Sequence, residues 1–256
     1  MSKSPYETLV ESEIIKKIKT QETFKGIYKI LPSIYNVLML LPFYRGKLCD
    51  DNDTEMVCIQ DAFQFFIHDS GFKIRNIISL MEIGSYGDAS ILLRTLIETF
   101  IIYKYYIMKK DGTGLKDYFS NDSNRKGKPR IKDIFEKVVP NYYDKYYSNL
   151  CLNTHGNPFA QAASRSNVSK GSPSSNIYNI NIDTFASVYN QLLPMIIGII
   201  NLYKYVYPNN VLDTEDITKD ELPKVSKFII EDMNYKEKNF PNLKEILNYY
   251  KQIINI

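Results

Sequence analysis

The chain has 256 residues, of which 44% are hydrophobic and 24% charged, a composition that excludes a disordered or fibrous protein and allows a sizeable globular core. The formal net charge of +3 is small for this length, which argues against a surface broadly coated with nucleic acid and permits a local basic groove. Cys49, Cys58 and Cys151 form no CxxC pair. Neither a disulfide scaffold nor a cysteine zinc site is therefore expected, and the cytoplasm is the expected compartment.

Membrane association is not expected from the sequence. The N-terminal segment has no apolar run of the kind that marks a signal peptide. The most apolar long segment, Phe185–Tyr207, is broken by polar residues, and its longest apolar run is about half of the ~20 residues that a membrane span needs. This segment is predicted to be a helix of the protein core.

Helical periodicity dominates the first third of the chain, and clean strand alternation is absent. An amphipathic helix is predicted over 8–30, ended by Pro32, with a second apolar piece over 34–41. After an acidic linker, Asp53 or Thr54 is expected to cap a helix that runs to about residue 83 and that Gly71 interrupts. The residues expected to face inward there are Met56, Ile59, Phe63, Phe66, Ile67, Ile74, Ile77, Ile78 and Met81.

The rest of the chain also reads as helical. Asp88 is expected to cap a helix to about residue 110, residues 111–130 to form a loop, and Pro140 to split helices over 131–139 and 141–153. A polar loop over 160–176 precedes a helix capped by Asp183 or Thr184, and two shorter helices are expected over 216–254. The fold class is all-α, an up-and-down bundle in one domain (1–256), with a core at about 53–207, an N-terminal extension (1–48) and a C-terminal tail (208–256).

Two charged residues stand in the apolar run after Asp88. Arg94 and Glu98 are four positions apart and so share one face of a helix. Buried charges persist when they are paired or used. The pair is therefore either an internal ion pair that fixes helix packing or the polar floor of a site, and the sequence leaves both open.

The chain has two histidines, and imidazole is the side chain that titrates near neutral pH. His155 ends a predicted helix before a long polar loop, where it would either cap carbonyl groups or act as a general acid and base. His68 lies in an aromatic stripe and is expected to be a hydrogen-bonded core or boundary residue and not a catalyst.

A basic cluster precedes a run of tyrosines. Such a cluster could hold single-stranded nucleic acid by phosphate contact and stacking, but a solvated, charged loop followed by tyrosines that pack a helix is the favoured explanation. The residues concerned are Arg125, Lys126, Lys128, Arg130 and Tyr146. Metal-binding, phosphate-loop and serine-hydrolase motifs are absent from the sequence, so no metal and no cofactor are expected.

The order Gly84-x-Tyr86-x-x-Ala89, then LRTLIE over 93–98, then Tyr146, Leu150 and His155 resembles an uncharacterised bacterial family of helical proteins with an LLRxxxE helix and a YxxL…H helix end. That family in turn resembles the HEPN superfamily (higher eukaryotes and prokaryotes nucleotide-binding domains), over roughly residues 55–205. Catalytic members carry Arg and His four to six residues apart on one helix. This chain has no such pair, so Arg94 and His155 would have to meet from different helices.

The resemblance implies a homodimeric helical protein of bacterial anti-phage defence or toxin type that acts on, or binds, RNA or a nucleotide. As a metal-independent endoribonuclease it would use His155 as general acid and base, Arg94 to stabilise charge, and Glu98 to orient Arg94. A protein antagonist or defence partner is also implied. The alternative is a non-catalytic helical module that binds partners or senses a ligand. A membrane-proximal toxin is a third, weaker hypothesis.

Overall fold

The computed structural model describes residues 53–82, 85–120, 127–148, 182–207 and 216–255, together with 30, 32–34 and 36–37. The predicted helices over 8–30 and 141–153 and the loop over 160–176 thus lie partly or wholly outside the described residues. The described elements are α3 (Thr54–Glu82), α4 (Tyr86–Lys109), α5 (Gly112–Phe119), α6 (Ile131–Val138), a π-helical turn (Tyr143–Tyr147), α9 (Ile182–Val206), α10 (Asp216–Asn239), a 3-10 turn (Pro241–Leu243) and α11 (Lys244–Ile254).

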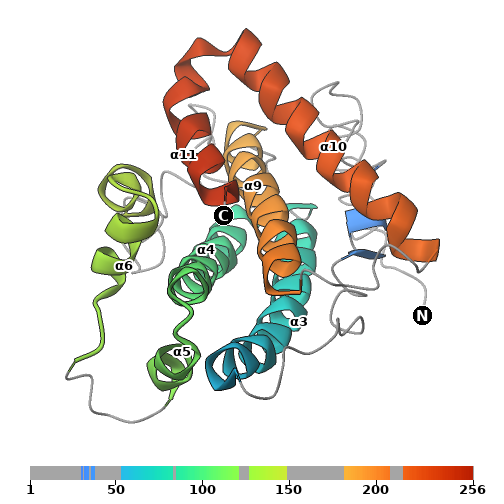
Figure 1. Cartoon of the computed structure of the whole chain (residues 1–256). Helices are drawn as coiled ribbons and strands as arrows, with labels where there is room; N and C mark the ends of the chain where they lie inside the picture. Colours follow the sequence, from blue (N-terminus) through green and yellow to red (C-terminus); the bar gives the residue numbers. More distant parts are fainter. Residues whose placement is uncertain are drawn as a thin grey trace, which may run out of the picture.

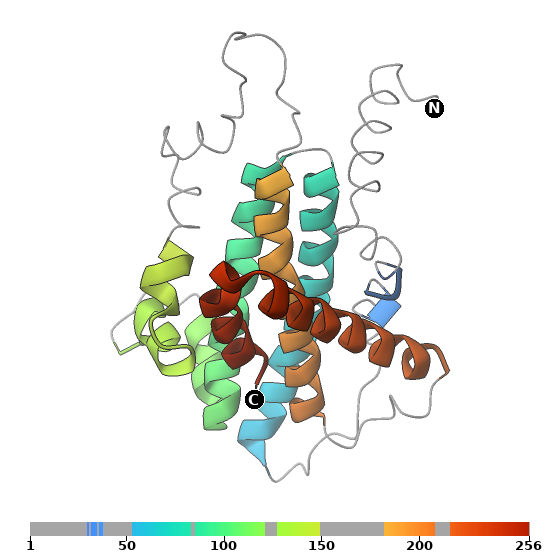
Figure 2. The ribbon, with the colours of Figure 1, turned by 90° about the horizontal axis from the view of Figure 1, so that it is seen from above.

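These elements form an all-α bundle, and no strand occurs in the described part of the chain. Helices α3 and α4 run in opposite directions, and α9 lies beside both (Figure 1). Helix α10 crosses α9, and α11 folds back beside α9 (Figure 2). The fold class predicted from the sequence is confirmed.

Helix α3 follows the predicted pattern closely. The Asp53 carboxylate accepts a hydrogen bond of 3.1 Å from the backbone N–H of Met56, which is the expected N-cap. All the residues predicted to face inward are buried except Met56, which is partly buried. The predicted interruption at Gly71 is wrong, because the helix continues through this residue to Glu82.

Helix α4 is the centre of the bundle. Every residue from 101 to 107 is buried, because α3, α5, α6 and α9 all pack against this helix. Its predicted cap is wrong. The helix begins at Tyr86, so Ser85 is the N-cap residue, and Asp88 lies inside the first turn, where its carboxylate accepts a 2.5 Å hydrogen bond from the Ser85 hydroxyl.

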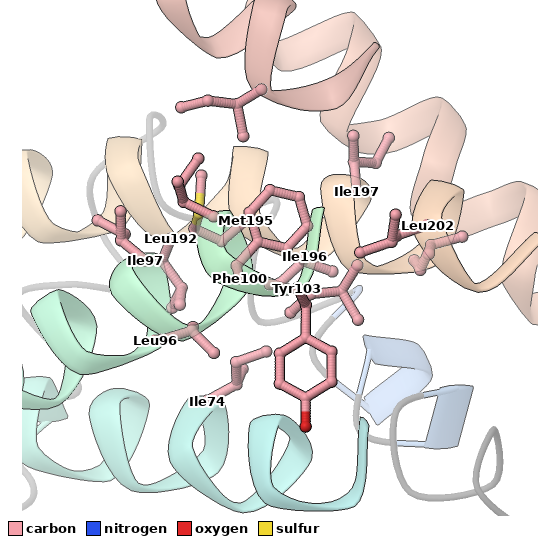
Figure 3. Packing of buried hydrophobic residues seen from close by; sticks show 14 of the residues in the cluster. Ile74, Leu96, Ile97, Phe100, Tyr103, Leu192, Met195, Ile196, Ile197 and Leu202 are labelled. Carbon is pink, nitrogen blue, oxygen red and sulfur yellow. The ribbon is translucent and has the colours of Figure 1, made fainter. Parts of the chain in front are cut away.

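Helix α9 is buried throughout residues 191–200, as expected of a core helix that is apolar on all sides. Figure 3 shows Phe100 of α4 among Leu192, Met195 and Ile196 of α9. A Cβ on Gly198 would lie 2.8 Å from the Phe100 ring, so a glycine here allows the two helices to approach closely. No described helix is long and apolar enough to cross a membrane.

The chain between α4 and α6 differs from the prediction of a loop over 111–130. Residues Gly112–Phe119 form helix α5. The Asp111 carboxylate caps this helix through the N–H of Gly114 at 2.7 Å, and Glu55 of α3 accepts hydrogen bonds from the N–H and hydroxyl of Thr113, both at 2.7 Å. Tertiary contacts thus stabilise a helix in a segment whose glycines predict a loop.

The C-terminal helices join the same apolar cluster as α3, α4 and α9. Helices α10 (24 residues, with Pro223) and α11 (11 residues) lie where two helices shorter than the preceding one were predicted, and α10 is only one residue shorter than α9. Ile253 and Tyr250 of α11 are fully or almost fully buried. Helix α9 begins at Ile182, before the predicted caps Asp183 and Thr184.

Because several tyrosines are buried, the stability of the fold is expected to decrease at alkaline pH. Burial raises the pKa of Tyr103 and of Tyr106 to about 12, and it also raises the pKa of the buried Tyr142 and Tyr250 well above the usual value. In the unfolded chain these groups ionise near pH 10. Their contribution to stability is therefore complete below pH 10 and is lost as the pH rises through the folded-state pKa values.

We expect the free energy of unfolding to fall steadily above about pH 10. Urea titrations at pH 9, 10 and 11 would measure it, and absorbance at 295 nm would report tyrosinate formation. Full ionisation of all tyrosines near pH 10 in a chain that keeps its helical circular dichroism would contradict this expectation.

Candidate functional site

Arg94 and Glu98 lie one turn apart on α4, on the side that faces the π-helical turn. Both side chains are partly buried, whereas their neighbours Leu93, Leu96 and Ile97 are completely buried. The pair therefore lies at the edge of the core, where its polar atoms remain near the surface.

The hydroxyl of Tyr147 connects the two charged residues. The Arg94 Nε–H donates to the Tyr147 oxygen at 3.2 Å, and the Tyr147 hydroxyl donates to Glu98 Oε2 in a short hydrogen bond. The guanidinium carbon lies 5.8 Å from the centre of the Tyr147 ring, within the range of a cation–π contact. One tyrosine thus holds the guanidinium and the carboxylate in a fixed relation.

The pKa of Tyr147 is raised well above its usual value, first by burial and then by the hydrogen bond to Glu98; Arg94 acts in the opposite direction. At neutral pH this phenol is therefore a proton donor and not a base. The arrangement presents one cation and one carboxylate, bridged by a neutral hydroxyl.

The local sequence explains how Tyr147 reaches this position. Asn141, directly after Pro140, has a φ of +65°, and its N–H donates to the Glu136 carboxylate at 3.1 Å, so the chain turns sharply after α6. The π-helical turn over Tyr143–Tyr147 follows. Phe135 of α6 packs 4.5 Å from the Tyr147 ring, and this contact fixes the ring so that the hydroxyl points to α4.

The other residues predicted for the site are only partly described. His155, Arg125 and Lys126 lie outside the described residues. Lys128 donates to the carbonyl oxygens of Tyr118 and Ser120 at 3.4 and 3.3 Å, and Arg130 is exposed directly before α6.

Tyr146 is partly buried between two other rings. Its centroid lies 5.8 Å from that of Tyr142 and 5.4 Å from that of Tyr249. Burial and the nearby Glu245 carboxylate raise its pKa. Tyr146 thus has a packing role in the structure, and its predicted role in nucleic-acid binding stays a prediction.

Two buried residues that make hydrogen bonds, Tyr147 in this site and Lys104 in the core beside α11, are not predicted from the sequence. The role of Tyr147 could not be recognised from the neighbouring sequence, because Glu98, to which its hydroxyl donates, lies 49 residues earlier in the chain. Lys104 lies in the same apolar run as Arg94 and is 2% exposed. A lysine within an apolar run indicates a buried cation with a partner elsewhere in the chain, since buried lysines are rare unless they are paired.

Among the described residues, no group of three or more His, Cys, Asp or Glu side chains is placed to hold a metal ion. In comparisons with known proteins, no family model, no curated protein and no solved structure matches the chain.

We expect Tyr147→Phe to lower the free energy of unfolding by about 1 to 2 kcal/mol, since hydrogen bonds to charged groups contribute about 1.5 to 3 kcal/mol and water can replace part of this loss at a partly exposed pair. Urea denaturation at pH 7 would measure the change. The matched control is Tyr142→Phe, five positions earlier, whose buried hydroxyl has no hydrogen-bond partner. That variant is expected to be as stable as the wild type or more stable, and equal losses in both variants would contradict a bridging role for Tyr147.

Proposed function

We propose that this protein is an HEPN-like, metal-independent endoribonuclease of bacterial defence or toxin type. It would act in the cytoplasm as a homodimer. The observation that supports the proposal is the bridge from Tyr147 to Arg94 and Glu98. The bridge brings the charged residues of α4 to the same segment that continues, eight positions later, to His155.

The proposed reaction is internal transesterification of RNA. His155 takes the proton of a 2′-hydroxyl, and the 2′-oxygen attacks the adjacent phosphorus. The bond from phosphorus to the 5′-oxygen breaks, and His155 returns the proton to that oxygen. The products are a 2′,3′-cyclic phosphate and a 5′-hydroxyl end.

In this mechanism Arg94 stabilises the negative charge that develops on the phosphate oxygens. Tyr147 and Glu98 are positioning residues, because the Tyr147 hydroxyl accepts from Arg94 Nε and is itself oriented by its hydrogen bond to Glu98. Arg125, Lys126, Lys128 and Arg130 would contact RNA phosphates on either side of the cleaved bond.

The experiment compares the wild type with His155→Ala on a synthetic single-stranded RNA in the presence of EDTA. Cleavage by the wild type with a cyclic phosphate end, detected by mass spectrometry, supports the proposal when His155→Ala is inactive and melts at the same temperature. The matched control is His68→Ala. His68 is the only other histidine of the chain. It is exposed on α3, with its ring centroid 4.9 Å from that of Phe72, so this variant should retain full activity. Equal cleavage by His155→Ala would contradict the mechanism.

A second candidate function is a non-catalytic helical module that senses a ligand or binds a partner. It is favoured by the burial of Tyr147, which is 1% exposed and which suits a purely structural clamp between α4 and the π-helical turn. The double variant Arg94→Met/Glu98→Leu discriminates the two. An architectural pair can be replaced by apolar residues of similar size at little cost, with binding or toxicity retained, whereas an active site would lose all activity.

A further inference from the structure

A cavity of about 260 Å³ lies where α9, α10 and α11 meet, in the region where α10 crosses the bundle (Figure 1). Most of its wall is apolar and includes Leu193 of α9, Met233 of α10 and Leu247 of α11. Its volume is below the ~300 Å³ at which pockets for drug-sized ligands begin. An occupant would therefore be a small molecule with an apolar body.

One end of this cavity is polar. Lys236 and Asp232 of α10 both line it and form an ion pair with a short hydrogen bond. Their side chains are only 7% and 15% exposed. The Lys236 ammonium also lies 5.0 Å from the centre of the Tyr189 ring. The pair is held at a fixed place, and its net charge is zero.

Two further residues with polar groups line this cavity. Tyr250 of α11 is one of them; it is 1% exposed, and its hydroxyl has no hydrogen-bond partner among the residues that the structure describes. A buried hydroxyl without a partner costs about 1 to 3 kcal/mol, so such groups usually have a partner in the working state of a protein. The other is Asn190 of α9, which is half-buried.

The neutrality of the ion pair restricts the charge of the occupant. An anion would draw Lys236 from Asp232 and leave the carboxylate buried without its partner, and a cation would do the reverse. A neutral group can accept from the remaining ammonium hydrogens and donate to the remaining carboxylate positions without breaking the pair. A carboxamide or lactam has this donor and acceptor side by side.

We propose that this cavity binds a neutral small molecule that carries a carboxamide- or lactam-type edge on a compact apolar body. The edge meets Asp232 and Lys236, and the body lies against Leu193, Met233 and Leu247. Arg94, Glu98 and His155 are not among the described residues that line this cavity. Ligand binding here can therefore be tested independently of the proposed ribonuclease activity.

The test uses the full chain labelled with ¹³C at the methionine methyl groups. Four probes of similar size are compared at up to about 5 mM, because molecules this small bind weakly: benzamide, benzoate, benzylamine and ethylbenzene. We expect benzamide to shift the Met233 methyl signal with at least tenfold tighter binding than the other three. Met108, which is 53% exposed at the end of α4, provides the control signal that should not move.

The double variant Asp232→Leu/Lys236→Met tests the polar end, and it is expected to reverse the preference, so that ethylbenzene binds at least as tightly as benzamide. Tighter binding of benzoate or benzylamine to the wild type would overturn the neutral class. The absence of any shift at Met233 with all four probes would overturn the site. If the double variant does not fold, the four probes on the wild type decide the question.

Discussion

Replacing Lys104 by Met is expected to lower the free energy of unfolding by about 3 kcal/mol, because it removes a buried charged donor and leaves its acceptors without partners. Lys104 lies in the C-terminal part of α4, and its ammonium donates to three carbonyl groups at the end of α11. The bonds to Gln252 and Ile253 measure 2.8 and 2.9 Å, and a short one goes to Asn255.

These bonds complete the hydrogen bonding of the α11 C-terminus. The last four carbonyl groups of a helix have no partner within it. In α11 the Lys251 carbonyl accepts from the Asn255 N–H, and the Ile254 carbonyl accepts from the Asn201 side chain of α9 at 3.1 Å. The Lys104 ammonium donates to the carbonyl groups of the two residues between them, Gln252 and Ile253. A methionine side chain has no donor that could replace these bonds.

Urea denaturation of Lys104→Met at pH 7 would measure the loss. The matched control is Lys116→Met on α5, an exposed lysine whose replacement should change stability by less than about 0.5 kcal/mol. A Lys104→Met variant as stable as this control would show that water can satisfy the α11 carbonyls.

The contribution of Lys104 to the free energy of unfolding is also expected to depend on pH. Burial lowers the pKa of Lys104 to about 8, below the value near 10.5 in an unfolded chain. Between these two values the unfolded chain binds more protons, so the contribution of Lys104 to stability rises with pH from about 8 to 10.5. Lys104→Met lacks this contribution, and its stability difference from the wild type should widen across that window.

The second large effect is expected from Gly112→Ala, which should lower the free energy of unfolding by about 3 kcal/mol, at the upper end of the range for overpacking. A Cβ at this position would lie 2.1 Å from the Glu55 carbonyl oxygen and 2.8 Å from Cys58 Cβ. Because the first of these is backbone of α3, α5 must move away and would also lose the hydrogen bonds from Thr113 to the Glu55 carboxylate.

The matched control is Gly87→Ala in the first turn of α4, where a Cβ would meet nothing within 4 Å. That variant should be more stable by about 0.5 to 1 kcal/mol, because alanine favours the helix. Thermal unfolding of both variants would measure the two shifts, which should have opposite signs. A Gly112→Ala variant with the melting temperature of the wild type would contradict the close contact of α3 and α5.

The sequence was sufficient for the helices whose stability comes from one continuous apolar face. The pattern from Met56 to Met81 predicts both α3 and its buried side, and the Asp53 cap lies next to it in the chain. Helix α5 was not predictable, since Gly112 and Gly114 read as breakers and the stabilising partner, Glu55, lies 58 residues away from Thr113.

For the candidate site, the spacing of Arg94 and Glu98 indicates a shared face, and α4 places them there. The tyrosine that bridges them could not be chosen from Tyr142, Tyr143, Tyr146 and Tyr147 by periodicity, because a π-helical turn changes the angle between successive side chains. The Tyr147 hydroxyl bonds to Arg94 and Glu98 of α4, while the Tyr142 hydroxyl has no hydrogen-bond partner in the described part of the chain.

The position of the Lys104 acceptors also sets an order of events during synthesis. Lys104 leaves the ribosome 148 residues ahead of Gln252, which at about 5 to 20 residues per second corresponds to a delay of roughly 7 to 30 s. Throughout this interval α4 carries an ammonium group for which the core has no acceptor. The Lys104 ammonium can therefore reach these three acceptors only after residues 252–255 have emerged, so this part of the core forms late in the synthesis of the 256 residues.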